Sequence, residues 1–338
     1  PCGEQEGEFA QPIVDRAGRV NHGFARAEIL LGNVGYLELR HFHPPEEGAN
    51  TALAAMAFLA NVDALIVDLR DSGGGEDTMD HLLVSHLFAE PTHLCTHEYR
   101  ARGERVEAWT NPDDASWRRP DLPVYVLVGR TTFSAAEGFA YNLQALGRAI
   151  VVGERSRGGG HTVEFATFPE LGVEAMIPNG RAINPVTGEN WEGVGVAPDI
   201  ESDDVRALGV AHRAALQALV AADEDPERTR FWRWALESLE ARLAPCAVPH
   251  AADLAAFAGR YGTVEIRLDD DALSLCWDGR RAHRLTPLDE TRFEFDGGRE
   301  RVRFVSEGGT IVAAVFETQE GDAYRVARTG LANDVPSQ

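Results

Sequence analysis

Two short segments of this sequence place chemically useful groups directly after an apolar run. The first reads DLRDSGGG and covers residues 68–75. Consecutive glycines tolerate positive φ, so their backbone N–H groups can point at one spot without obstruction by a Cβ atom. Such a loop suits a phosphate or an oxyanion, and a flexible turn is the alternative. A phosphate loop would continue with Lys and Ser or Thr, whereas Glu76 and Asp77 follow here. The segment therefore favours oxyanion stabilisation.

The second segment, VGRTTFSAAEGF over residues 128–139, places Ser134 at the expected start of a helix. The amides and the dipole of a helix N-terminus favour developing negative charge, which suits a nucleophilic serine. The alternative is structural, because Ser134 and Glu137 have the S-x-x-E spacing of a capping box. A nucleophile and an oxyanion loop are both needed beside one sheet edge, so the two segments together favour catalysis. The G-x-S-x-G pattern of the α/β-hydrolase elbow is absent.

Two further groups of residues could suggest a metal. His93, Cys95 and His97 alternate and would share one face of a strand, but no fourth ligand accompanies them. Four acidic residues near the first segment lack the spacing of an EF-hand calcium loop: Asp71, Glu76, Asp77 and Asp80. We expect the first group to be ordinary surface residues and the second to form a solvated acidic face. No metal or other cofactor is predicted.

The elements around these segments alternate between strands and helices, which predicts an α/β layered domain. Strands are expected at residues 35–39, 64–69, 124–128 and 149–152, and helices at 51–60, 77–88 and 134–146. Asn50 is expected to cap the first of these helices. Reactive groups gather beyond the carboxyl ends of the strands in open α/β sheets, so both chemical segments belong at one edge.

The rest of the chain has a different pattern. Between residues 161 and 200, Gly, Pro and Asn interrupt short extended runs, which indicates hairpins and ordered loops. Amphipathic helices are expected at 205–222 and 227–243, followed by short alternating strands. We therefore divide the chain into a core at residues 1–200, a helical connector at 201–245 and a small all-β accessory domain at 246–338.

Composition excludes several classes of function. The 338 residues are 44% hydrophobic and 25% charged, as in soluble globular domains, and their formal net charge is −22. Proteins bind nucleic acids and anionic membranes through clustered Lys and Arg side chains, so this negative net charge argues against both as partners. No apolar run approaches the roughly 20 residues of a membrane span, and the first residues do not read as a signal peptide. Four widely spaced cysteines fit neither a disulfide framework nor a C-x-x-C zinc site, which leaves the compartment open: Cys2, Cys95, Cys246 and Cys276.

Five segments, taken in order, resemble peptidase family S41. They are GYLELRHF (35–42), IVDLRDSGGG (66–75), TTFSAAEGFAYNLQALGRAIVVGE (131–154), RGGGH (157–161) and NGRAINPVTGENWEGVGVAPDI (179–200). The resemblance covers most of residues 20–200. It is closest to the branch of the interphotoreceptor retinoid-binding protein modules and the tricorn-like members, rather than to the C-terminal processing proteases.

The resemblance implies a ClpP/crotonase-like β-α spiral core and a serine-type peptidase with Ser134 as the nucleophile. It also implies an oxyanion hole made by backbone amides of Gly74 and Ala135. The processing proteases use a downstream lysine as the base, but the corresponding run RSRGGGH at 155–161 contains no lysine. A tricorn-like Ser/His/Glu set is therefore favoured over a Ser/Lys dyad, and Glu192 takes the role of orienting the imidazole.

The histidine of this set has several candidates. His161 follows the glycine run and matches a histidine position of the related loop, so it is the candidate base, with a loop-structural or substrate-contacting role as the alternative. In tricorn-like members this histidine comes from a region N-terminal to the GYLEL strand, so a base outside this chain is a further alternative. Other imidazoles near the matched segments belong to His22, His41 and His43. Glu189 competes with Glu192 for the orienting role, and the resemblance favours Glu192.

These inferences lead to two functional hypotheses. The first is a serine peptidase that acts on peptide or protein substrates through a Ser134 acyl-enzyme. The second is a catalytically inactive module that binds a hydrophobic, retinoid-like ligand on the same fold. A histidine within hydrogen-bond reach of the Ser134 hydroxyl would count against the second hypothesis. The resemblance also favours an extracytoplasmic location, periplasmic or secreted, and leaves a homo-oligomer open.

Overall fold

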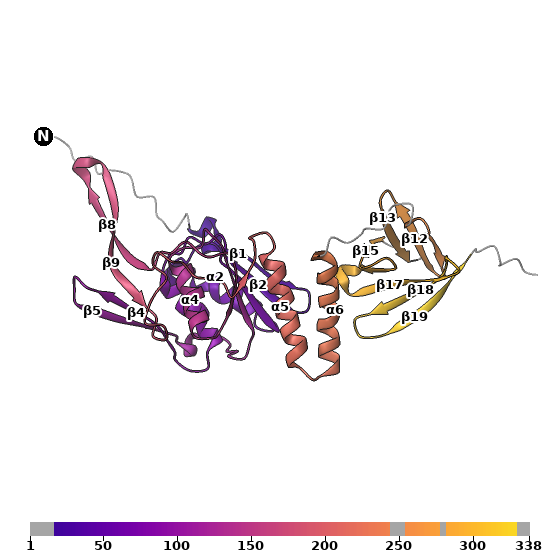
Figure 1. Cartoon of the computed structure of the whole chain (residues 1–338), viewed down its shortest axis with the longest axis horizontal. Helices are drawn as coiled ribbons and strands as arrows, with labels where there is room; N and C mark the ends of the chain where they lie inside the picture. Colours follow the sequence, from indigo (N-terminus) through magenta and orange to yellow (C-terminus); the bar gives the residue numbers. More distant parts are fainter. Residues whose placement is uncertain (1–16, 244–253, 278–281, 330–338) are drawn as a thin grey trace, which may run out of the picture. The chain divides into compact units, whose positions relative to one another are not determined.

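The computed structural model describes residues 17–243, 254–277 and 282–329 of the chain. The chain divides into two compact units, Pro1–Ala215 and Leu216–Gln338, and each is described by itself (Figure 1). Helix α5 (Ala207–Ala222) runs across the boundary between the units. Among the described helices, none combines the length and the apolar composition that crossing a membrane requires.

The first unit is built on a six-stranded sheet with the strand order β1-β2-β3-β6-β7-β10. Its strands are β1 (Phe24–Leu30), β2 (Val34–Leu39), β3 (Ala64–Asp68), β6 (Val124–Val128), β7 (Ile150–Gly153) and β10 (Ile200–Glu201). Strand β1 pairs antiparallel with β2, and the other pairings of this sheet are parallel. All residues of β3 and β6 are buried, which accounts for their almost continuous apolar sequences.

Helices α2 (Pro45–Phe58), α3 (Asp77–Val84) and α4 (Ala135–Ala145) share one hydrophobic core with this sheet. Helix α3 continues into the short 3₁₀ helix η2 (Ser85–Leu87). The prediction that Asn50 caps the first helix is wrong, because α2 begins at Pro45. Proline is preorganised for the first helical position, and Glu46 and Glu47 in the first turn complement the helix dipole.

A second, antiparallel sheet belongs to the same unit, with the strand order β5-β4-β9-β8. Its strands are β4 (His93–Tyr99), β5 (Glu104–Trp109), β8 (His161–Phe168) and β9 (Val173–Ile183). Strands β8 and β9 form a long hairpin that extends away from the six-stranded sheet (Figure 1). Hairpins were expected from the sequence between residues 161 and 200, over the α/β layer; β8–β9 is a hairpin in this range, but its pairing with β4 was not expected. Short 3₁₀ helices occupy η1 (Asn21–Gly23), η3 (Pro112–Asp114) and η4 (Pro169–Leu171).

The second unit contains helix α6 (Pro226–Leu243) and an antiparallel sheet in the order β14-β13-β12-β11-β19-β18-β17-β16-β15. The strands are β11 (Gly259–Tyr261), β12 (Val264–Asp269), β13 (Ala272–Trp277), β14 (His283–Arg284), β15 (Thr286–Pro287), β16 (Arg292–Phe295), β17 (Glu300–Glu307), β18 (Thr310–Thr318) and β19 (Ala323–Thr329), with the 3₁₀ helix η5 (Asp296–Gly298). The division into core, connector and accessory domain stays a prediction.

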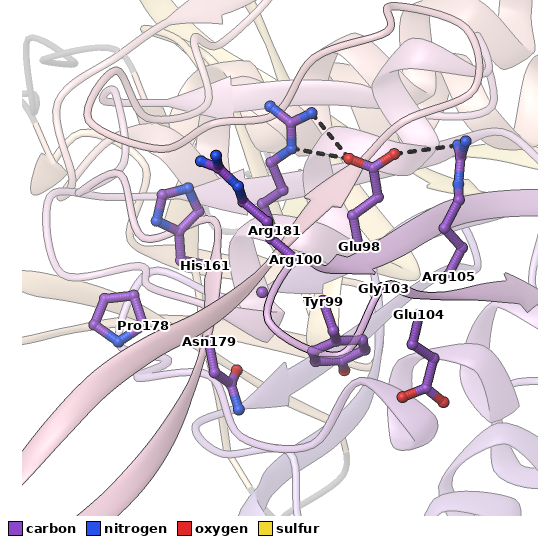
Figure 2. A pocket seen from close by; sticks show the side chains of 11 residues that line it. Glu98, Tyr99, Arg100, Gly103, Glu104, Arg105, His161, Pro178, Asn179 and Arg181 are labelled. Carbon is purple, nitrogen blue, oxygen red and sulfur yellow. Dashed lines mark hydrogen bonds and ion pairs between the residues drawn. The ribbon is translucent and has the colours of Figure 1, made fainter.

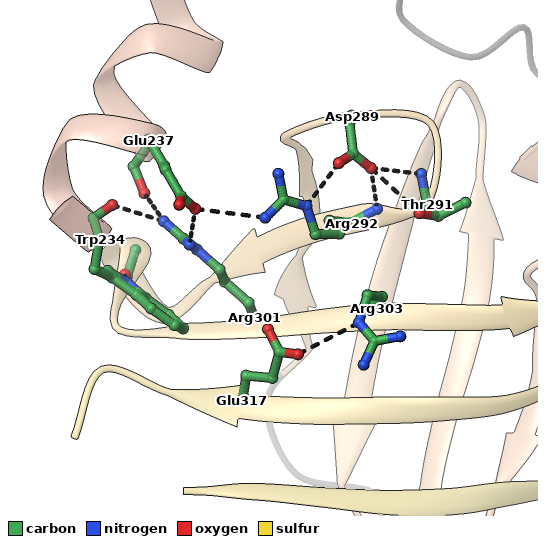
Figure 3. A network of polar contacts seen from close by, with 10 residues as sticks. Trp234, Glu237, Asp289, Thr291, Arg292, Arg301, Arg303 and Glu317 are labelled. Carbon is green, nitrogen blue, oxygen red and sulfur yellow. Dashed lines mark hydrogen bonds and ion pairs between the residues drawn. The ribbon is translucent and has the colours of Figure 1, made fainter. Parts of the chain in front are cut away.

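A buried arginine of this sheet forms hydrogen bonds and a ring contact with α6 (Figure 3). Arg301 on β17 is 3% exposed and donates hydrogen bonds to the Glu237 carboxylate at 2.7 Å and to the Trp234 carbonyl at 2.6 Å. Its guanidinium carbon also lies 3.7 Å from the centre of the Trp234 ring. A buried charge is tolerated only when it is paired and hydrogen-bonded, and all three contacts come from α6. The helix therefore belongs structurally with the strands that follow it.

Candidate active site

Ser134 ends the loop that leads from β6 into α4. It is the N-cap of α4, is half-buried, and adopts φ 56° and ψ −125°. A non-glycine residue with such angles is strained and persists only where its surroundings hold it. The loop after β3 supplies the holding contacts. The Phe133 N–H donates to the Ser72 carbonyl at 3.0 Å, and the Thr132 hydroxyl donates to the Leu69 carbonyl at 2.7 Å. The serine is thus presented on a sharp strand-to-helix turn.

The glycine loop after β3 lies directly against this serine. Gly74 adopts φ 90°, and a Cβ atom added to it would lie 2.7 Å from Ser134 Cβ and 2.9 Å from the Ala135 nitrogen. Gly75 adopts φ 134°, and a Cβ atom there would lie 2.1 Å from the Phe42 carbonyl oxygen. Both positions therefore require glycine, because other residues rarely adopt such a positive φ and because a Cβ atom would collide with neighbouring atoms. The glycines seen in the sequence allow the loop to approach Ser134 with its backbone.

Backbone amides beside Ser134 are available to an anion. In the part of the chain that the structure describes, neither the Gly74 N–H nor the Ala135 N–H donates a hydrogen bond to a protein acceptor. Ala135 is the first residue of α4, where unpaired amides and the helix dipole favour negative charge. Unpaired donors next to a serine side chain can stabilise the oxyanion of a tetrahedral intermediate. Ser134, Gly74 and Ala135 thus lie together, and the two amides have no acceptor among the described residues.

The Glu137 carboxylate holds this turn in place. It is fully buried and accepts a hydrogen bond from the Ser134 backbone N–H at 2.9 Å. It also accepts hydrogen bonds from the Gly158 and Gly159 N–H groups at 2.6 and 2.8 Å and from the Ser156 hydroxyl at 2.5 Å. Charge-assisted hydrogen bonds of this length are among the strong ones in proteins. The S-x-x-E spacing predicted only a cap, whereas the carboxylate also ties the serine turn to the glycine run after β7.

The end of the same glycine run brings Glu192 and His161 together. The Glu192 carboxylate accepts the Gly160 N–H at 2.7 Å, and the same oxygen lies 3.8 Å from His161 Nδ1. The side chains of His161 and Glu192 are 36% and 40% exposed. On the other side of the run, a Cβ atom added to Gly159 would lie 2.2 Å from the Phe133 ring. The run therefore connects the histidine to the residue that precedes the serine.

The structure does not join this histidine to the serine. No histidine among the described residues forms a hydrogen bond with Ser134, and the described carboxylate within ion-pair distance of His161 is Glu192. Glu189, the alternative orienting carboxylate, is exposed and forms no ion pair with a described histidine. Of the two glutamates, Glu192 is thus the one whose carboxylate lies within ion-pair distance of a described imidazole.

A sequence profile described as peptidase family S41 matches residues 33–202, which is just over half of the 338 residues. The chain belongs to peptidase family S41. The matched range contains Ser134, the glycine loop, Glu137, His161 and Glu192. The prediction of an S41-type serine-peptidase domain is confirmed at the level of the family.

Three known proteins illustrate the similarity. A protein of Staphylococcus saprophyticus subsp. saprophyticus, named "Probable CtpA-like serine protease", is 25% identical over 182 residues, covering 53% of this chain and 36% of that protein. The structure of the photosystem II D1 C-terminal processing protease is 25% identical with a TM-score of 0.42, covering 52% of this chain and 45% of that one. The tricorn protease structure is 18% identical with a TM-score of 0.31, covering 62% and 18% of the two chains. The matches thus span less than half of each of these relatives, and they do not distinguish the branches of the family.

The other candidate histidines form a separate cluster in the first unit: His22, His41 and His43. The rings of His41 and His43 lie 4.6 Å apart, and those of His22 and His43 lie 6.1 Å apart. His43 Nδ1 lies 3.5 Å from the Glu47 carboxylate. Burial, and then the neighbouring His43, lowers the pKa of His41. The cluster adjoins the glycine loop through Phe42, whose N–H donates to a carbonyl of that loop at 2.8 Å.

The expected surface face of His93, Cys95 and His97 is not formed. The register of β4 against β5 shifts between His93 and Cys95, and both Cys95 and His97 are buried. His97 Nε2 lies 2.9 Å from the Asp77 carboxylate and 3.4 Å from Cys95 Sγ. Burial raises the pKa of the Cys95 thiol to about 12, so the thiol stays protonated at neutral pH. Within residues 17–243, 254–277 and 282–329, no group of three or more ligating side chains is arranged to hold a metal ion.

The predicted solvated acidic face is wrong at Asp80. This residue is 3% exposed, because it lies on the side of α3 that faces α4, where a Cβ atom added to Gly138 would lie 3.9 Å from Asp80 Oδ2. Its Oδ1 atom has no hydrogen-bond partner among the described residues. Burial, and secondarily the charge of Asp77, raises the pKa of Asp80 well above its ordinary value. The S41 core thus contains a carboxyl group that favours its neutral form.

Replacing Asp80 with asparagine is expected to become more favourable to stability as the pH rises. An acid whose pKa is raised by folding stabilises the protein below its unfolded pKa, and this contribution is lost as the pH rises through the folded value. Asparagine does not titrate, so the difference in unfolding free energy between Asp80→Asn and wild type should grow from about pH 4 upward. Urea unfolding across this pH range measures the difference. Asp113→Asn, at an exposed position, is the control, and equal pH profiles for both variants would contradict the prediction.

Proposed function

We propose that this S41 domain is a serine peptidase of the tricorn-like type, in which Ser134 forms an acyl-enzyme. The observation that carries the proposal is the strained Ser134 beside the unpaired amides of Gly74 and Ala135. The Ser134 oxygen bonds to the substrate carbonyl carbon while its proton passes to a base, and the two amides hold the resulting oxyanion. The C–N bond then breaks, the amine leaves with that proton, and water hydrolyses the ester.

We assign the base to His161, with Glu192 orienting its imidazole. The support is the approach of the Glu192 carboxylate to His161 Nδ1 at 3.8 Å, which leaves Nε2 available for proton transfer. His161 follows the glycine run that Glu137 ties to the Ser134 turn. Catalytic hydrogen bonds are often long before substrate binds, and the side chains of His161 and Glu192 are both partly exposed, which leaves room for them to change rotamer. The absence of lysine from residues 155–161 also favours a histidine base.

The proposed fold is the ClpP/crotonase-like β-α spiral. It is supported by the parallel pairing of β2, β3, β6, β7 and β10, and by the helices that follow β2, β3 and β6. The loops after β3 and β6 meet at the carboxyl edge of the sheet, where open α/β sheets bind their ligands.

The alternative is a catalytically inactive module for a hydrophobic ligand. In its favour, Ser134 forms no hydrogen bond with a described histidine. A site for a hydrophobic ligand, however, is lined mainly by apolar side chains. The groove beside His161 is instead lined by three arginines and two glutamates among its residues. The peptidase is the better supported of the two functions.

Replacing His161 with glutamine tests the assignment of the base. In a peptide-hydrolysis assay, His161→Gln is expected to lower kcat by about 10²–10⁴-fold with little change in KM, because general-base catalysis acts in the transition state. The matched control is His43→Gln, which removes another imidazole near the glycine loop. A loss of kcat in His43→Gln alone would move the base to the histidine cluster. If the wild-type protein neither hydrolyses peptides nor reacts with a fluorophosphonate at Ser134, the peptidase proposal fails.

A further inference from the structure

A row of four side chains crosses the four-stranded sheet in register. His161 on β8 is opposite Arg181 on β9, Arg181 is opposite Glu98 on β4, and Glu98 is opposite Arg105 on β5. Directly opposite residues of antiparallel strands project from the same face. Glu98 accepts hydrogen bonds from Arg181 at 2.9 and 3.2 Å and lies 3.4 Å from Arg105 (Figure 2). One carboxylate thus serves two guanidinium groups, and the row has a surplus positive charge.

This row lines a groove with a volume of about 740 Å³. Arg100, at the end of β4, adds another guanidinium group, and in the view of Figure 2 its side chain lies between His161 and Arg181. Arg100 is exposed, and it has no ion-pair or hydrogen-bond partner among the described residues. Glu104, the other acidic residue of the groove, lies 3.8 Å from Arg102. The groove is therefore positive in a chain whose formal net charge is −22.

The groove adjoins the proposed active site. His161 lines the groove and also faces the Glu192 carboxylate at 3.8 Å. The glycine run before His161 packs on Phe133, the residue that precedes Ser134. A peptide whose scissile bond reaches Ser134 can therefore place a neighbouring group in the groove.

We propose that this groove selects peptide substrates that carry a carboxylate, held by the guanidinium groups of Arg100 and Arg181. The inference rests on the proposed peptidase function. Guanidinium groups bind carboxylates through paired, charge-assisted hydrogen bonds. The guanidinium N–H groups of Arg100 donate no hydrogen bond to another described residue, so they are available to a substrate carboxylate. A basic substrate group is disfavoured at the same place by like-charge repulsion. The carboxylate comes either from an Asp or Glu side chain or from the C-terminus of the peptide.

Binding of short fluorescein-labelled peptides to the Ser134→Ala protein tests this inference. One set carries a single Glu at each position in turn and a C-terminal amide, a second set has Gln in place of Glu, and a third has no acidic residue and a free C-terminus. Fluorescence anisotropy measures the affinities. We expect a carboxylate set to bind about tenfold more tightly than the Gln set, and we expect Arg100→Gln to remove this preference.

The control is Arg206→Gln, which removes the same charge at an exposed position outside the groove and should leave the preference intact. Tighter binding of the Glu set identifies a side-chain carboxylate, and tighter binding of the third set identifies the C-terminus. Equal affinities for all sets, or a preference unchanged in Arg100→Gln, would overturn the inference. Because binding is measured without hydrolysis, a carboxylate preference in a wild-type protein that never cleaves peptides would contradict only the peptidase function. If the wild-type protein cleaves all sets with equal kcat/KM, the peptidase function is supported, and the proposal that the groove selects a carboxylate is contradicted.

Discussion

Replacing Ser134 with alanine is expected to abolish peptide hydrolysis, with a loss in kcat of about 10⁶-fold. The change removes the only atom that forms the acyl-enzyme and keeps the Cβ atom, so the strained φ of 56° at this position is unchanged. The backbone N–H that donates to Glu137 at 2.9 Å also remains. The fold should therefore survive while the chemistry is lost. Initial rates with a peptide pool and labelling with a fluorescent fluorophosphonate measure the effect.

The control for this prediction is Ser202→Ala, which removes a half-buried hydroxyl at the end of β10. We expect this variant to be labelled and to hydrolyse peptides as the wild-type protein does. Circular dichroism should show the same secondary structure for both variants. Labelling of Ser134→Ala at the wild-type rate would place the reactive nucleophile elsewhere and would contradict the assignment of Ser134.

Replacing Glu137 with glutamine is expected to weaken both catalysis and stability. Oε2 accepts hydrogen bonds from the backbone N–H groups of Ser134 and Gly159. Oε1 accepts hydrogen bonds from the Gly158 N–H and from the Ser156 hydroxyl. A glutamine must place an NH₂ group at one of these positions, so at least one buried N–H loses its acceptor. Such a loss, with the loss of the buried charge, costs about 3 kcal/mol. The Ser134 turn also loses the anchor that holds its strained conformation.

We expect Glu137→Gln to lower kcat and the rate of fluorophosphonate labelling by about 10²-fold, with a much smaller change in KM. A smaller fraction of folded protein would also lower the apparent kcat without changing KM. Urea unfolding therefore measures the folded fraction under assay conditions, and the kcat of the folded protein reports the positioning of Ser134. The matched control is Glu154→Gln, a partly exposed carboxylate that pairs with Arg130 at 2.9 Å. Its stability should stay within about 0.5 kcal/mol of wild type. Wild-type labelling and unfolding of Glu137→Gln would show that the buried hydrogen bonds do not position the serine.

Features that depend only on residues close together in the sequence could be predicted from it. The almost continuous apolar runs at β3 and β6 produced strands within one residue of the predicted ranges. The helix start at Ser134 follows from its S-x-x-E spacing, and α4 begins at the next residue. The predicted start of α2 failed because two prolines and an acidic first turn outweighed Asn50 as a local signal.

The candidate site could be predicted only in part. The glycine loop and Ser134 were found because each follows a buried strand, and parallel strands end at one sheet edge. Spacing could not show that a Cβ atom on Gly74 would touch the serine, although that contact explains the glycine. Spacing also could not choose among the histidines, because the position of an imidazole depends on the loop that carries it.

The sequence by itself determined the family, the alternation of strands and helices from β2 to β7 in the parallel part of the first sheet, and the two loops that meet at Ser134, but not strands β1, β4 and β5. Only the tertiary structure decided which side chains share a site. It gave Glu137 partners at Gly158 and Gly159, buried Asp80 between α3 and α4, and aligned His161 with the arginines of β9 and β5. The physical reason is that burial and side-chain hydrogen bonds depend on segments far apart in the chain, whose approach is set by strand pairing and helix packing rather than by local spacing.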